Sequence, residues 1–416
     1  MDTSAPTSDF PETRKIQNPV IDQIFFGRTP EAVSFVDGVV SEAIKLSASD
    51  ILFEPQVSDL RVRARIDGAL YEFGKVGLDS YQSISSRIKV LAGLDPTEKR
   101  KIQEGQYTSE IEGRTVNLRV EITQTINGEL IVIRIHEKET ILMDLSQLGF
   151  SVTAYGNYNK MLSQRSGLIL ACGPTGCGKT TTLYSTITKL NQGHNLNVMT
   201  IENPVEFQLE AVNQMQTQDE IGFSFADGLR TTLRLTPDVV LVGEIRDKET
   251  AEIAVESGLT GQLVLSTLHA DDSVGALFRL LDLGIETYFI NSSLVGIVAQ
   301  RLVRNICQGC KEEYKPDSKE IELFTQILGR PPKRVMKGKG CPACQNLAFK
   351  GRLGIFEVMV MTATVRDMLR KKVNEDVFRK GLMDAGFITL LKDGLDKVEQ
   401  GLTTVEEVLT SSFRVF

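Results

Sequence analysis

The sequence predicts an α/β protein whose largest part is a parallel β-sheet covered by helices on both faces. From about Leu148 onward, short apolar runs at 168–172, 198–201, 239–242 and 263–266 alternate with helical stretches. Continuous apolar strands of this kind are typical of parallel sheets that are buried on both faces. A glycine-rich loop joins the first of these strands to a helix, and two C-x-x-C pairs follow the last one. With 416 residues, the chain is long enough for two or three domains.

Composition is that of ordinary globular domains, with 41% hydrophobic and 24% charged residues. No run of about 18 apolar residues and no charged-then-apolar leader is present, so we expect a cytoplasmic protein that reaches a membrane only through a partner. A formal net charge of −7, the absence of tryptophan and only 6% aromatic residues count against direct binding to nucleic acid.

The first part of the chain predicts a tail and a small domain. Residues 1–28 are rich in Thr, Ser, Pro and Asp, and we expect a flexible tail there. Residues 29–142 predict a small α+β domain. Its expected elements are a helix over 30–46, a strand over 60–66, a helix over 81–94, and two strands over 116–122 and 131–135.

Two arginines stand on the polar faces of the last two strands. The period of two puts Arg119 opposite Leu118 and Val120, and it puts Arg134 opposite Ile133 and Ile135. Both guanidinium groups can therefore leave the core, and taken alone they are best interpreted as solvated surface charges.

The strongest motif is a G-x-x-x-x-G-K-[ST] loop between a strand and a helix, which is the context of a phosphate-binding loop. Its residues are Gly173, Pro174, Thr175, Gly176, Cys177, Gly178, Lys179 and Thr180, followed by Thr181. Glycines allow successive N–H groups to turn inward, and the helix N-terminus adds partial positive charge. We expect Lys179 to reach the β- and γ-phosphates and Thr180 to coordinate Mg²⁺.

Acidic residues follow two further strands of the predicted sheet. Glu202 and Glu206 lie at the end of one strand, and Glu244 ends another. Ligands of open α/β sheets bind beyond the carboxyl ends of the strands, so these carboxylates are candidates for binding Mg²⁺ or activating water. Glu244 is the first choice for both roles. His269, just past a core strand, is either a structural histidine or a sensor of the γ-phosphate.

Four cysteines form the second strong signal. Cys307, Cys310, Cys341 and Cys344 make two C-x-x-C pairs at the spacing of two knuckles around one tetrahedral Zn²⁺. Since all four ligands come from protein, the site should be structural. We therefore divide the rest of the chain into a nucleotide-binding core over 143–300, a zinc-binding subdomain over 301–355 and a helical subdomain over 356–416.

Together these motifs resemble those of the secretion ATPase superfamily that powers type II secretion and type IV pilus assembly. The resemblance extends over about residues 49–408. Besides the phosphate loop it rests on the acidic segment 200–206, the segment Gly-Glu-Ile-Arg-Asp at 243–247 and the histidine segment 260–272. The cysteine pairs are typical of the secretion and pilus-extension branch, and typical retraction ATPases lack them.

The resemblance implies a RecA-like P-loop ATPase core with a PAS-like N-terminal domain. In the family, arginines of the small domain act on the bound nucleotide, and the matching positions are Arg119 and Arg134. The resemblance further implies ATP, Mg²⁺ and Zn²⁺ as cofactors, a homohexamer, and an inner-membrane platform protein as partner.

The sequence departs from the family pattern at several points. Asn203 stands where Asp is common. Leu52 replaces the histidine of the usual Ser-Asp-Ile-His pattern, and the strand after Arg119 continues differently from Glu121 onward. The chain also begins almost at the small domain, so we expect a different docking contact or a short branch of the family.

The function that we predict is a cytoplasmic ATPase motor that hydrolyses ATP to assemble type IV pili or pseudopili. The alternatives are a ring-shaped nucleic-acid translocase or helicase, a pilus retraction ATPase, and a regulatory nucleotide-binding module that performs no mechanical work. Stimulation by DNA would favour the first alternative.

Overall fold

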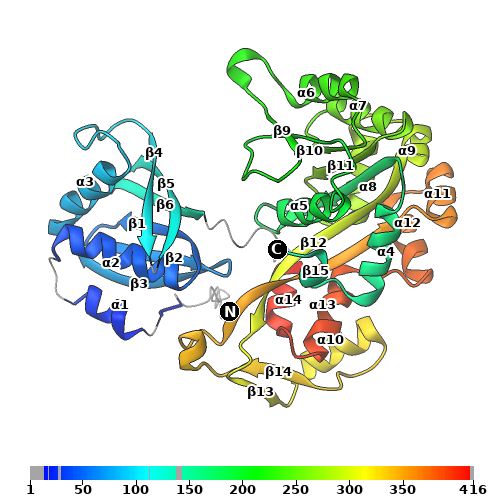
Figure 1. The fold of residues 1–416 in the computed structure, drawn as a ribbon. Helices are drawn as coiled ribbons and strands as arrows, with labels where there is room; N and C mark the ends of the chain where they lie inside the picture. Colours follow the sequence, from blue (N-terminus) through cyan, green and yellow to red (C-terminus); the bar gives the residue numbers. More distant parts are fainter. Residues whose placement is uncertain (1–13, 17, 27–29, 112, 137–142, 413–416) are drawn as a thin grey trace, which may run out of the picture. The chain divides into compact units, whose positions relative to one another are not determined.

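The computed structural model describes residues 14–16, 18–26, 30–111, 113–136 and 143–412 (Figure 1). The chain forms two compact units. The small unit comprises Met1–Lys138, Cys307–Lys311 and Gly338–Gly351, and the large unit comprises Glu139–Ile306, Glu312–Lys337 and Arg352–Phe416. Each unit has its own sheet and its own hydrophobic core. No helix among the described residues has both the length and the apolar character needed to cross a membrane.

The small unit is built on a six-stranded sheet in the order β3-β2-β1-β6-β5-β4, in which neighbouring strands are antiparallel. Its strands are β1 (Ala48–Pro55), β2 (Asp59–Ile66), β3 (Ala69–Gly77), β4 (Gln103–Ile111), β5 (Arg114–Thr125) and β6 (Gly128–His136). The helices α2 (Ala32–Lys45) and α3 (Tyr81–Leu91) supply buried apolar residues to the same core. The strand and helices expected over 30–94 are thus confirmed to within a few residues.

The segment expected to be a flexible tail contains a short helix. Residues 1–13, 17 and 27–29 lie outside the described residues, but α1 (Pro19–Ile24) begins after Asn18, whose side chain accepts hydrogen bonds from the N–H groups of Val20 and Ile21. Ile21 is fully buried, and Ile16 is 5% exposed. Because the helix has fewer than two turns, it shows no apolar periodicity in the sequence.

The large unit is organised around a seven-stranded sheet in the order β15-β12-β7-β11-β10-β8-β9. Six of its strands, from β12 to β9, are mutually parallel, which confirms the predicted parallel core. The strands are β7 (Gly167–Cys172), β8 (Val198–Glu202), β9 (Asn213–Gln216), β10 (Val239–Val242), β11 (Leu263–Leu268), β12 (Leu294–Ile306) and β15 (Phe349–Val360). A separate pair is formed by β13 (Lys311–Tyr314) and β14 (Val335–Gly338).

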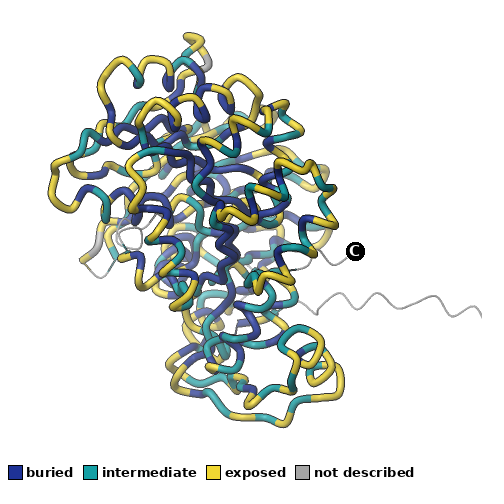
Figure 2. The backbone as a smooth tube through the Cα atoms, turned by 90° about the vertical axis from the view of Figure 1, so that its right-hand side faces the viewer, coloured by how far each residue is buried: buried dark blue, intermediate teal, exposed yellow. Residues whose placement is uncertain are grey.

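Successive side chains of this sheet enter two different apolar clusters. Leu168 and Leu170 of β7 pack in one cluster, whereas Ile169 and Ala171 pack in the other. The period of two therefore buries both faces, and the exposed segments lie on the outside of the unit (Figure 2).

Helices cover each of the two faces. The face of Ile169 packs against α4 (Val152–Leu162) and α5 (Lys179–Leu190). The other face packs against α6 (Phe225–Thr232), α7 (Lys248–Leu259), α8 (Ser273–Asp282), α9 (Thr287–Ser293), α11 (Ala363–Arg370), α12 (Glu375–Asp384), α13 (Leu390–Glu399) and α14 (Val405–Ser412). Phe324 of α10 (Ser318–Leu328) joins this second cluster. The helices after residue 356 thus share a core with the seven-stranded sheet.

Candidate functional site

The glycine-rich loop connects β7 directly to α5. Gly173, Gly176 and Gly178 have φ angles of +148°, +77° and +91°, which residues other than glycine rarely adopt. No side chain caps the start of α5. The first N–H groups of this helix therefore remain available for an anionic ligand.

Lys179 at the start of α5 turns back over the loop. Its Nζ donates hydrogen bonds to the carbonyl oxygens of Gly173, at 2.8 Å, and Pro174, at 3.0 Å. Phosphate oxygens are stronger acceptors than these neutral carbonyls. The ammonium group can therefore exchange loop carbonyls for phosphate without leaving the site.

A cleft of about 480 Å³ opens beside the loop and is lined by residues of the large unit. It brings together most of the predicted site residues, namely Thr175, Gly176, Gly178, Lys179, Thr180, Thr181, Glu202, Glu206, Glu244 and His269. Gly173, Pro174 and Cys177 do not line it. Cys177 is 5% exposed, and burial raises the pKa of its thiol.

The parallel register explains why these residues meet. Leu268 pairs with Cys172, and Val242 pairs with Ile201 and Ser266, so the four strands end at the same edge of the sheet. Ligand sites of open α/β sheets lie at this edge.

Glu244 lies two residues beyond β10 and is partly covered. Its side chain is 17% exposed, Oε1 accepts a hydrogen bond from the Arg246 guanidinium, and Oε2 lies 3.6 Å from Nε2 of His269. The hydroxyl of Thr267 donates to the carbonyl of Gly243 at 2.7 Å, which fixes the backbone before Glu244. The carboxylate is thus held at the cleft by two cationic or cation-forming side chains.

Glu202 is buried, in contrast, and its oxygens are occupied. It is 4% exposed and accepts hydrogen bonds from the Tyr184 hydroxyl, from Thr200 Oγ1 at 2.5 Å and from Gln214 Nε2 at 3.1 Å. Burial, followed by the bond to Glu202, raises the pKa of Tyr184 well above its usual value. Glu206 is exposed, and its carboxylate forms no hydrogen bond with another described residue.

Some lining residues were not predicted from the sequence. Tyr184 lies four residues beyond Thr180 on α5, so the helical period could have suggested that it faces the same site. Phe225, Leu302 and Arg352 come from three distant segments, and no local pattern identifies them.

In the small unit, Arg119 and Arg134 are direct cross-strand partners on β5 and β6. Both are exposed, at 44% and 53% of the side chain, while the neighbouring Leu118 and Val120 are buried. Arg119 pairs with Glu104 at 2.8 Å, and Arg134 pairs with Asp50 at 3.2 Å. Directly opposed like charges are destabilising unless such partners neutralise them.

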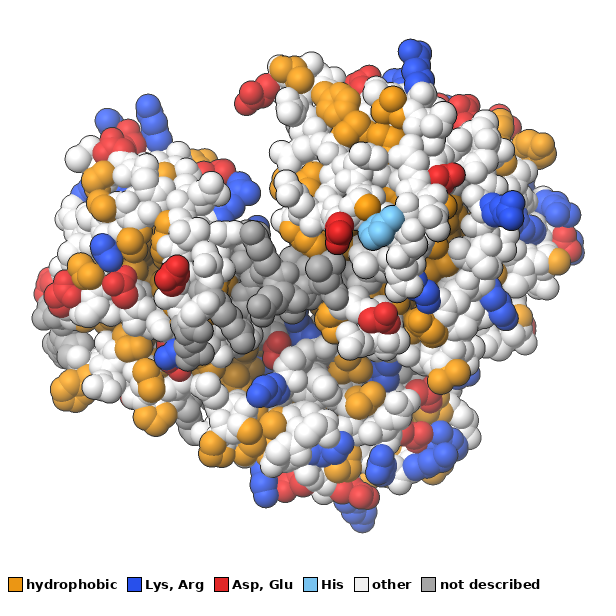
Figure 3. Space-filling view, in the orientation of Figure 1, with side chains coloured by type: hydrophobic (Ala, Val, Ile, Leu, Met, Phe, Trp, Pro, Cys, Tyr) orange, Lys and Arg blue, Asp and Glu red, His pale blue; other side chains and the backbone are white. Residues whose placement is uncertain are grey.

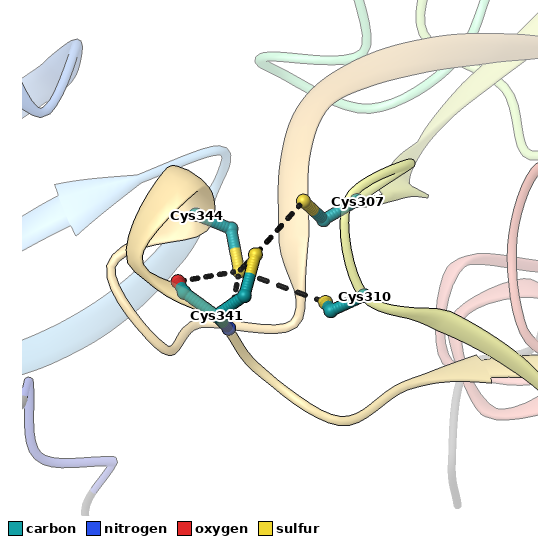
Figure 4. Close-up of side chains that lie close together, drawn as sticks. All are labelled: Cys307, Cys310, Cys341 and Cys344. Carbon is teal, nitrogen blue, oxygen red and sulfur yellow. Dashed lines mark hydrogen bonds between the residues drawn. The ribbon is translucent and has the colours of Figure 1, made fainter.

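The four predicted zinc ligands converge in the small unit (Figure 4). Their Sγ atoms all lie within 4.8 Å of one another, with 3.8 Å between Cys307 and Cys341 and 3.8 Å between Cys310 and Cys344. Tetrahedral Zn²⁺ with bonds of about 2.3 Å places its sulfurs about 3.8 Å apart, so the residues fit this ion.

The thiols of the cluster differ in acidity. Burial raises the pKa of Cys310 to about 12, while the N–H of Cys344 and other donors lower the pKa of Cys341 to about 7. Metal ligation requires thiolates, so binding would release protons from this cluster.

Charged side chains are mixed on the face of the molecule seen in Figure 3. Lys and Arg are interspersed with Asp and Glu, and the described residues of this face form no continuous basic field. This distribution agrees with the negative net charge of the sequence.

Comparison with known proteins gives consistent matches over most of the chain. The model of the Type II/IV secretion system protein family matches residues 30–410. The chain is 40% identical to the Type II secretion system ATPase E of Vibrio cholerae over 377 residues, which are 91% of this chain and 74% of that protein. It is 39% identical to the type IV pilus assembly ATPase PilB of Myxococcus xanthus, over 91% of this chain and 67% of that protein.

Solved structures support the fold. The Legionella pneumophila ATPase DotB superposes with a TM-score of 0.66 at 22% identity, over 92% of this chain and 95% of that one. The pilus retraction motor PilT with bound ADP superposes with a TM-score of 0.57 at 23% identity, over 89% and 95%. The chain therefore belongs to the Type II/IV secretion system protein family and is an ATP-hydrolysing enzyme.

Proposed function

We propose that this ATPase is a homohexameric motor that drives the assembly of type IV pili or pseudopili. In this proposal it works at the cytoplasmic face of the inner membrane and transmits force to a platform protein in that membrane. Relatives at 39–40% identity that are named as a type II secretion system ATPase and a type IV pilus assembly ATPase support this choice of machine.

The cleft beside the phosphate loop is the observation that carries the proposal. It joins a cationic loop to carboxylates at neighbouring strand ends, which is the arrangement that phosphoryl transfer to water requires. Lys179 would bind the β- and γ-phosphates, and Thr180 and Glu244 would hold Mg²⁺. A bound Mg²⁺ would neutralise charge on the phosphate oxygens.

The remaining polar residues receive separate roles. Glu244 is the proposed base for the attacking water, with Glu206 as the alternative. Because Glu202 already accepts three hydrogen bonds, we assign it to holding the site together. His269 would report the γ-phosphate through a hydrogen bond.

Arg119 and Arg134 would act on the phosphates during the catalytic cycle. They are exposed on one face of their sheet and directly opposed, so they offer two guanidinium groups to one anion. An arginine supplied in this way can stabilise the charge of the transition state.

The tetracysteine cluster favours an assembly motor over a retraction motor. Its sulfur spacing fits zinc, and a zinc element is typical of the secretion and extension branch. The likeness to PilT, at 23% identity, concerns the fold alone.

The test is the rate of phosphate release by the purified protein with two separate additions. Detergent-solubilised platform protein should stimulate the rate and co-purify with the ATPase, whereas double-stranded DNA should leave it unchanged. Light scattering after size-exclusion chromatography should give the mass of a hexamer in the presence of a non-hydrolysable ATP analogue. Stimulation by DNA with a steep salt dependence, and none by the platform protein, would instead favour the translocase.

A further inference from the structure

The strand β12 continues beneath the phosphate loop. It lies next to β7 in parallel register, with Ala299 beside Cys172, the last residue of β7. β7 ends there, but β12 runs on to Ile306. The residue after Ala299, Gln300, therefore lies beside the beginning of the loop.

Gln300 forms a buried hydrogen bond to the loop. Gln300 is 1% exposed, and its Nε2 donates a hydrogen bond to the carbonyl oxygen of Cys177 at 2.8 Å. Its Oε1 has no hydrogen-bond partner among the described residues. Donation to the loop is thus the interaction that this amide makes.

The peptide group between Cys177 and Gly178 connects this bond to the cleft. In a planar trans peptide the C=O and the following N–H point in opposite directions. The Cys177 carbonyl points to the buried amide, so the Gly178 N–H points the other way. Gly178 lines the cleft, and no described residue accepts a hydrogen bond from its N–H.

We propose that Gln300 is a positioning residue for the nucleotide phosphates, which holds the Cys177–Gly178 peptide so that the Gly178 N–H faces the cleft. The role rests on ATP binding at this cleft and not on the machine that the ATPase serves. Without the amide donor, the peptide can rotate and present its carbonyl to the phosphates, which repel it.

The packing of the loop supports this role. A Cβ atom on Gly178 would lie 3.0 Å from Gln300 Nε2, and one on Gly173 would lie 2.7 Å from the backbone oxygen of Gln300. Gln300 thus packs closely against both glycines. The loop rests closely on β12, so a change at Gln300 reaches the backbone directly.

The experiment compares Gln300→Met with a matched control, Thr403→Val. Methionine keeps the length of glutamine but has no donor for the Cys177 carbonyl. Thr403 is fully buried and donates to the carbonyl oxygen of Arg304 at 2.8 Å, at the far end of β12. Each variant removes one buried donor to a backbone carbonyl, and thermal melting verifies that both are folded.

We expect Gln300→Met to weaken ADP binding about tenfold, the equivalent of about 1.4 kcal/mol. For AMP, which lacks the β-phosphate, the affinity of Gln300→Met should stay within about twofold of that of the wild type, and Thr403→Val should change neither affinity. The KM for ATP should rise by about the same factor as the dissociation constant of ADP. The kcat should change less than about threefold, because the contact exists before and during the reaction.

Four results would overturn the proposal. Unchanged ADP affinity of Gln300→Met would show that the donor is dispensable, and an equal loss of ADP and AMP affinity would show a general disturbance of the cleft. An equal loss in Thr403→Val would assign the effect to stability. A wild-type protein that binds no ADP would overturn the nucleotide site itself, and the role of Gln300 with it.

Discussion

Replacing the three glutamates of the cleft by glutamine, one at a time, separates the residue that activates water from the residue that holds the site. Glu202 is buried under three donors, Glu206 is exposed, and Glu244 is partly covered beside His269. The same chemical change should therefore have three different effects on stability and turnover.

For Glu202→Gln the loss should appear as stability. Hydrogen bonds to a charged acceptor contribute about 1 kcal/mol more than neutral ones, so neutralising the acceptor of three bonds costs about 3 kcal/mol. A buried amide costs less desolvation than a carboxylate, which offsets part of this loss. We expect the free energy of unfolding to fall by about 1–2 kcal/mol and the melting temperature by about 2–8 °C. Turnover should stay within about tenfold.

For Glu244→Gln the loss should appear as turnover. Loss of a general base typically lowers kcat by about 10²–10⁴-fold. Its partners Arg246 and His269 are exposed, at 63% and 56% of the side chain, so these contacts add little stability and the melting temperature should change little. Glu206→Gln serves as the matched control, since its exposed carboxylate makes no hydrogen bond with another described residue, and we expect less than a tenfold change in kcat.

Phosphate release at saturating ATP and thermal melting by differential scanning fluorimetry measure both effects in the same preparations. A Glu202→Gln variant that loses turnover without a shift in melting temperature would refute the division of roles. Wild-type turnover in Glu244→Gln, with loss of turnover in Glu206→Gln, would transfer the role of base to Glu206.

Three further predictions concern other residues. Lys179→Ala should abolish hydrolysis and weaken ADP binding at least about tenfold with an unchanged circular dichroism spectrum, and wild-type turnover would contradict the site. Cys344→Ser should lose the single zinc ion per chain that elemental analysis should find in the wild type, and a wild type without zinc would contradict the metal centre. Arg119→Ala and Arg134→Ala should each lower kcat at least about 100-fold. The control is Arg65→Ala, because the Arg65 side chain also pairs with Asp50, and it should leave kcat within about threefold. Equal effects of the three variants would mean that they act by disturbing the fold of the sheet.

The parts of the fold that could be predicted depend on local patterns. Period two in the strands and continuous apolar runs indicated both sheets, and the parallel topology then brought the residues after the strands to one edge. The hydrogen bonds of Glu202 could not be predicted in this way. They depend on Tyr184 and Gln214, which precede and follow it by more than ten positions and meet it only in the folded sheet.

The length of β12 was missed for a related reason. The expected core ended at 300, yet β12 continues to Ile306, and Arg301 and Arg304 within it are each only 6% exposed. Buried arginines hide the apolar pattern of a core strand. Their partners are the carbonyl of Asp271 and the carboxylate of Glu407, and sequence order gives no sign of either contact.

The zinc cluster extends the same argument to domain boundaries. The sequence suggested one subdomain over 301–355, whereas contacts group both cysteine pairs with the small unit and the intervening Glu312–Lys337 with the large one. Within the small unit, Gln345 accepts a hydrogen bond of 2.6 Å from Asn18, and Leu347 packs against the apolar core. The cluster itself buries almost nothing but its cysteines. A bound zinc ion, worth on the order of 10 kcal/mol in such sites, would therefore supply the cohesion that apolar packing does not, and would hold two segments 34 residues apart in the small unit.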